Sequence, residues 1–147
     1  MSGLAGLLAG HTQPGIYKWH SGLHAPDIAH SVEHAGWVFV HFDGWAVEDK
    51  DTFLKSVGEA FEFPDWTGQS FDALADALAD VDARDGNGTI FLWDGWSPLA
   101  RADEQAFSVA LSVFGSRVHA DRGGPFAVLL RGEGPPLDVP DLNPHGG

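Results

Sequence analysis

The sequence contains no cysteine, and its 147 residues include only 8 Lys and Arg against 21 Asp and Glu. Without cysteine the chain has no disulfide framework and no thiol chemistry. The shortage of basic residues leaves a formal net charge of -13. That charge makes nucleic acids and anionic membranes poor direct partners, and it makes a basic protein a plausible one.

Long apolar runs are also missing, and none approaches the ~20 residues that span a bilayer. Residues 1–10 are mildly apolar but carry no Lys or Arg before a very short run, so we do not expect a signal peptide. An apolar fraction of 44% and six Trp indicate one globular domain with a single core. Together with the absence of cysteine, these features predict a soluble, cytoplasmic protein.

Three short apolar runs read as strands: residues 37–42, 89–93 and 126–130. Segments with helical spacing or helix start and stop signals lie around them: residues 26–34, 49–63, 69–82 and 107–118. Strands that alternate with helices predict an α/β fold, with a small three-stranded parallel sheet packed with helices. Residues 15–19 are the candidate for an extra N-terminal edge strand.

Changes in composition divide the chain into three parts. Residues 1–36 are predicted to form an N-terminal extension, partly ordered, with a short strand and a helix after 14 poorly ordered residues. Residues 37–131 are predicted to form the central domain. The Pro- and Gly-rich residues 132–147 are predicted to form a disordered tail.

The helix at about 69–82 has two chemically opposite faces. Its apolar residues gather on one side: Phe71, Leu74, Ala77, Leu78 and Val81. Three aspartates spaced four apart gather on the other: Asp72, Asp76 and Asp80. Like charges at this spacing destabilise a helix, and only Asp72 is favoured by the helix dipole. A row of charges that destabilises its own helix indicates a role in binding rather than in folding. The alternative interpretation is an ordinary solvated surface.

Residues 64–76 read Pro-Asp-Trp-x-Gly-x-x-Phe-Asp-Ala-Leu-x-Asp, which resembles the core motif of the barstar family, intracellular inhibitors of secreted guanyl-specific ribonucleases. The resemblance covers residues 37–130 and implies a barstar-like fold. It implies that Asp76 is the deepest anchor, standing in for a phosphate, with Asp72 second. It also implies that Trp66 packs on the enzyme's catalytic histidine and that Gly68 allows a close backbone approach.

The chain departs from the family pattern around these positions. Ser70 replaces an asparagine, Ala75 an aromatic residue, Thr67 a second aromatic, and Ser116 a glutamate. These changes indicate a different ribonuclease target or weaker binding to the usual one. The predicted partner-binding residues are Asp72, Asp76, Trp66, Thr67, Gly68, Ser70, Ala75, Ala79 and Asp80. Asp80 and the net charge would steer association with a basic ribonuclease in a one-to-one complex.

A competing motif lies at His30, Glu33 and His34, which spell H-x-x-E-H, the signature of an inverted zinc protease. On a helix both histidines would share a face and could ligate zinc, with Glu33 as base. The helix is short and no obvious third ligand follows, so we expect no metal site, no cofactor and no enzyme activity. An acidic interaction module for another basic protein is the further alternative.

Overall fold

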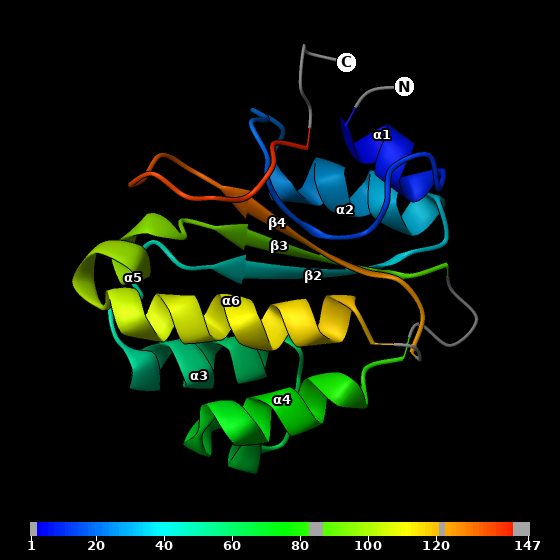
Figure 1. The fold of residues 1–147 in the computed structure, drawn as a ribbon. Helices are drawn as coiled ribbons and strands as arrows, with labels where there is room; N and C mark the ends of the chain where they lie inside the picture. Colours follow the sequence, from blue (N-terminus) through cyan, green and yellow to red (C-terminus); the bar gives the residue numbers. More distant parts are fainter. Residues whose placement is uncertain (1–2, 83–86, 121–122, 143–147) are drawn as a thin grey trace.

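The computed structural model describes residues 3–82, 87–120 and 123–142. A parallel sheet lies between helices on both of its faces (Figure 1). Its strands, in the spatial order β1-β4-β3-β2, are β1 (Ile16–Lys18), β4 (Phe126–Arg131), β3 (Thr89–Asp94) and β2 (Val38–Asp43). The prediction of an α/β fold with a parallel sheet is confirmed. The sheet has four strands and not three, because the candidate edge strand at residues 15–19 forms β1, which pairs with β4.

The two central strands explain the near-continuous apolar runs in the sequence. In β3 and β4 every residue before the last is buried, as expected for parallel strands that are covered on both faces. Ile90 and Leu92 face one apolar cluster, whereas Phe91 and Trp93 face the other. The sheet therefore separates two cores.

The larger core lies beneath α3 (Lys50–Ala60), α5 (Ser97–Ala102) and α6 (Glu104–Val118). The 3-10 helix η1 (Asp65–Gln69) and α4 (Phe71–Ala79) follow α3 in the chain. Figure 1 shows α4 farther from the sheet than α3 and α6, and its contacts run to α6, η1 and α3. The helix that carries the three aspartates is thus an outer element on this face.

The other face is covered by the N-terminal extension, through α1 (Gly3–Leu8), α2 (Ala25–His34) and Trp19. The first 14 residues are predicted to be poorly ordered, but α1 is a helix with Leu4 and Leu7 buried. Two leucines three positions apart share a helix face. Their burial against the second core compensates for the weak helix propensity of the glycines around them.

The C-terminal segment also differs from its prediction of disorder. Lys18 of β1 forms an isolated parallel bridge with Asp141, and the Leu142 amide donates to the Lys18 carbonyl at 2.8 Å. Leu142 is buried in the same cluster as Trp19. Residues 143–147 of the predicted tail lie outside the described residues. Up to Leu142, the segment is therefore packed against the β1 edge of the sheet.

Across the described ranges, no helix is both long enough and apolar enough to cross a membrane.

Candidate partner-binding site

The acidic helix begins where Ser70 interrupts the helical backbone. Ser70 is extended, with φ -165° and ψ 164°, and its Oγ accepts a hydrogen bond from the Ala73 amide at 3.0 Å. This is the preferred arrangement of an N-cap residue, which satisfies an amide that the helix leaves free. The predicted helix of 69–82 therefore starts only at Phe71, and the separate 3-10 helix η1 ends before the cap.

The apolar face of α4 packs inward, as its spacing predicts. Leu74, Ala77 and Leu78 are buried. Phe71 is half-buried against Phe53, with ring centroids 6.1 Å apart. The opposite face of the helix therefore has to point toward solvent.

That outer face carries the acidic row, by which we mean Asp72, Asp76 and Asp80. All three are exposed, and within the described part of the chain no Lys, Arg or His forms an ion pair with any of them. Their spacing places them about 6 Å apart along the helix axis. The acidic row thus presents three carboxylates whose hydrogen-bonding capacity is available to a partner.

Trp66 lies in η1, just before the acidic row, and 46% of its surface is exposed. Exposed tryptophans are rare on protein surfaces and frequent at interfaces. The neighbouring Gly68 has no strained backbone angle, and the nearest atoms to a Cβ there would be backbone atoms of Lys55 and Leu54, at 3.6 Å or more. The fold itself therefore tolerates a Cβ at Gly68, and the predicted reason for a glycine there remains the approach of a partner.

Two of the candidate residues have roles inside the turn instead. Thr67 is 1% exposed, and its hydroxyl donates to the Pro64 carbonyl at 2.8 Å. Its side chain is therefore not on the surface beside Trp66. Ser70 is half-buried and caps α4. Ala75 is half-buried, whereas Ala79 is exposed at the end of the helix.

Sequence reasoning did not single out Arg117 of α6. This arginine is only 3% exposed and donates to three main-chain carbonyls, of Val81, Gly123 and Gly124. It follows Phe114 by three positions and therefore shares the buried face of α6. This spacing could have indicated that Arg117 lies on the buried face. Because arginine is rarely buried, however, its residue type favours a solvent-exposed position.

A second charged cluster lies at the carboxyl ends of the strands. Arg131 pairs with Asp94, Nη2 to Oδ2 at 2.9 Å, and His41 Nε2 lies 2.8 Å from the same oxygen. Burial raises the pKa of Asp94, but hydrogen bonds from Arg131 and His41, with their charges, hold it below its ordinary value. Arg131 also donates to the Leu23 carbonyl. This cluster therefore ties the extension to the sheet.

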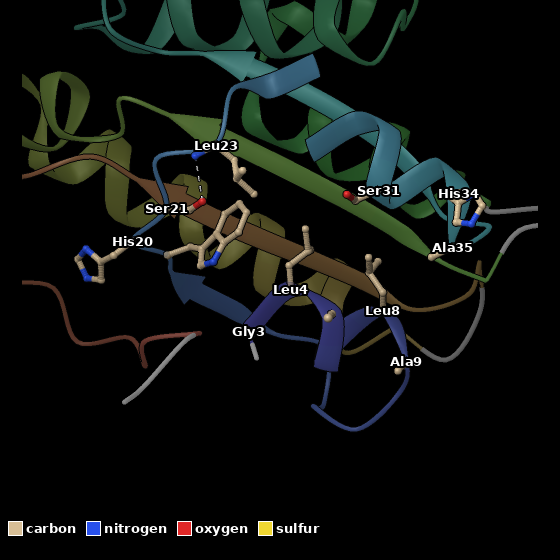
Figure 2. Close-up of a pocket in the computed structure, with 12 residues that line it drawn as sticks. Gly3, Leu4, Leu8, Ala9, His20, Ser21, Leu23, Ser31, His34 and Ala35 are labelled. Carbon is tan, nitrogen blue, oxygen red and sulfur yellow. Dashed lines mark hydrogen bonds between the residues drawn. The ribbon is translucent and has the colours of Figure 1, made fainter. Parts of the chain in front are cut away.

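The zinc alternative gains no support from the geometry. The rings of His30 and His34 stack with centroids 6.2 Å apart on the exposed side of α2. No group of three His, Cys, Asp or Glu side chains that could hold a metal occurs among the residues described. His34 and His20 line opposite ends of a pocket of about 580 Å³ between α1 and α2, whose middle is apolar (Figure 2).

The sequence and the fold were compared with known proteins. A family model described as barstar, barnase inhibitor, matches residues 37–131. No curated protein sequence matches the chain. Among solved structures, the Aeropyrum pernix ORC2 protein in ADPNP–ADP complexes has a similar fold, with a TM-score of 0.59 and 12% sequence identity. The match covers 89% of this chain but only 38% of the ORC2 chain, and it shows a shared fold alone.

Proposed function

The chain belongs to the barstar family, because the family model covers residues 37–131, and from this membership we propose that it inhibits a ribonuclease by filling the active site. The finer proposal is that the target is a secreted, guanyl-specific ribonuclease. In this proposal the acidic row and Trp66 form the contact surface. The carboxylates occupy the places of RNA phosphates.

The observation that carries the proposal is that the acidic row is exposed and unpaired within the described chain. A ribonuclease cleft holds a phosphodiester with Arg, Lys and His side chains. Carboxylates accept strong, charge-assisted hydrogen bonds from the same donors. Three carboxylates on α4 and its C-cap can therefore meet such a cleft without first breaking ion pairs of their own.

The proposed residue roles follow the pattern of the family. In that pattern Asp76, in the middle of the row, is the deepest anchor, and Asp72 is the second. Trp66 would stack on the catalytic histidine of the enzyme. Asp80 and the net charge of -13 would accelerate encounter with a basic protein. Because Thr67 is buried, its side chain contributes to the shape of the turn and not to the contact.

The test is inhibition of a panel of small, basic, guanyl-specific ribonucleases at low and high salt. We expect stoichiometric inhibition of at least one enzyme, weaker at high salt because exposed charges are screened. Asp76→Asn should weaken that inhibition at least about a hundredfold, since it leaves buried cations of the enzyme without their partner. Asp27→Asn, which removes the same charge from α2 across the sheet, should leave it nearly unchanged.

Two results would contradict the proposal in different ways. An Asp76→Asn protein that is folded and inhibits normally would rule out the acidic row as the part that fills the ribonuclease active site. Wild-type protein that inhibits no ribonuclease in the panel, yet binds other basic proteins in a salt-dependent way, would favour an acidic interaction module. The acidic row would then serve as bait to identify that partner.

A further inference from the structure

We infer that Arg117 of α6 is the positioning residue of the acidic row, because it holds the carboxyl end of α4; this inference rests on the proposed function. As an outer helix, α4 lies beyond α3 and α6 and is placed by a limited set of contacts (Figure 1). Ser70 fixes its first turn. Arg117 provides the corresponding polar contact at the other end.

One guanidinium joins three segments of the chain. Nη2 of Arg117 donates to the Val81 carbonyl at 2.9 Å and to the Gly123 carbonyl at 3.0 Å, and Nη1 donates to Gly124 at 3.3 Å. Val81 follows the last residue of α4 by two positions, and the two glycines precede β4. The end of the acidic helix is thereby fixed to α6 and to the start of a central strand.

The surroundings of Arg117 include an aromatic ring and an acidic residue, which partly offset the cost of burying its charge. Its guanidinium lies 4.9 Å from the centroid of the Phe126 ring. Burial lowers the pKa of Arg117, and the charge of Asp82 opposes that effect. The carboxyl end of a helix carries partial negative charge from its unpaired carbonyls, and a nearby cation stabilises it. Arg117 thus contributes both hydrogen bonds and charge at the end of α4.

The close packing at Gly123 supports the same role. This glycine has φ +85°, and a Cβ there would lie 2.4 Å from the Val81 carbonyl oxygen. The chain before β4 therefore approaches the end of α4 more closely than any side chain would permit. Arg117 donates to the Val81, Gly123 and Gly124 carbonyls at this close approach.

A lysine cannot reproduce the arrangement. The planar guanidinium directs several donors in fixed directions, whereas the lysine ammonium is a single point. Without the guanidinium the Val81 carbonyl loses its partner, and Asp80, the residue before Val81, is free to move with it. Asp76 is one turn earlier in the same helix. The carboxyl-terminal end of the acidic row, Asp80 first, would therefore lose its fixed orientation, although the charges of the row would be unchanged.

The experiment compares Arg117→Lys with Arg131→Lys, which also removes a largely buried guanidinium but at the opposite end of β4. Both variants keep the net charge, so electrostatic steering is the same. The readouts are the association and dissociation rates with the ribonuclease inhibited by the wild type, and hydrogen exchange of the α4 amides. Asp76→Asn supplies the reference for loss of a direct contact.

Arg117→Lys should leave the association rate nearly unchanged and raise the dissociation rate about tenfold or more. It should also speed exchange in the last turn of α4 about tenfold or more, because local opening becomes easier. Arg131→Lys should change neither readout, even if it lowers the melting temperature as much as Arg117→Lys does.

Equal dissociation and exchange rates in Arg117→Lys and wild type would overturn the inference. Equal effects of the two arginine variants would overturn it as well, because they would indicate general destabilisation. If the wild type binds no ribonuclease, the proposed function fails by itself. The exchange measurement then decides alone whether Arg117 holds α4.

Discussion

Among the described residues, aspartates differ in what their carboxylates contact, and three of these arrangements bear on the acidic row. Asp49 and Asp103 cap helices, accepting hydrogen bonds from the amides of Thr52 and Ala106. Asp94 is largely buried and paired with Arg131. The acidic row, in contrast, has no cationic partner within the described residues. Sequence spacing identifies that row, but it does not distinguish an exposed aspartate from a paired one.

At this scale the pairing of Asp94 makes a prediction about pH. Because the pKa of Asp94 is lowered in the folded state, its stabilising contribution is fully present above the unfolded pKa of about 3.9. That contribution disappears as the pH falls through the lower folded pKa. Asp94→Asn should therefore reduce the free energy of unfolding at pH 7 by about 2 kcal/mol. The difference from wild type should shrink below about pH 4.

Urea denaturation of both proteins between pH 3 and pH 7 checks this expectation. Asp138→Asn is the matched control, since Asp138 is exposed, and a surface change of this kind shifts stability by less than about 0.5 kcal/mol. A constant difference between wild type and Asp94→Asn across the whole range would show that the carboxylate charge is not what matters.

At the scale of the element, α4 illustrates how a helix is delimited by its surroundings. Its apolar spacing predicts a longer helix, from 69 to 82, but the observed helix is Phe71–Ala79. The shortening at the start comes from Ser70, whose extended backbone allows its hydroxyl to cap the helix. The cap is readable in the sequence only as a serine followed by a helical pattern, and serine has many other roles.

Ser70→Ala should lower the free energy of unfolding by about 1 kcal/mol, because the Ala73 amide loses its acceptor. For a domain of this size the melting temperature should fall by about 3 °C. Ser70→Asn should restore most of the stability, since asparagine caps helices equally well. Ser112→Ala, at an exposed position of α6, should not destabilise. A Ser70→Ala protein as stable as wild type in thermal unfolding would refute the cap.

Other elements show why the sequence predicts some features and not others. The strands β3 and β4 are nearly continuous apolar runs, so their prediction is confirmed. The helix α1 contains Gly3 and Gly6, which weaken its helical signal, and it is stabilised by tertiary packing. In α5, Pro98 reads as part of a loop, although proline is well tolerated in the first turn of a helix. The local sequence pattern alone does not reveal the tertiary packing that stabilises such helices.

At the scale of the whole molecule, the N-terminal extension completes the fold outside the family match. The family model begins at residue 37, yet one face of the central strands packs against residues before it. Ile90, Leu92, Ala127 and Leu129 are fully buried under this cover. The short β1 and the Arg131–Leu23 contact attach the extension to β4. The extension is therefore part of the same folded unit.

Deletion of residues 1–36 should expose that apolar face and produce a protein that aggregates or binds hydrophobic dyes. Its cooperative thermal transition should be lost or strongly lowered. The replacement Ile28→Asp, at a buried position of α2, should shift the full-length chain in the same direction. A truncated protein that is monomeric, melts like wild type and binds no dye would refute this dependence.

The burial of Leu142 in the same cluster as Leu4, Leu7 and Trp19 has a practical consequence. Both ends of the described chain belong to the cluster on one side of the sheet, whereas α4 lies on the other (Figure 1). Neighbouring termini that lie away from a binding surface permit fusion and circular permutation. A carrier domain, a surface tether or a fluorescent reporter joined at either end should therefore leave the acidic row facing outward.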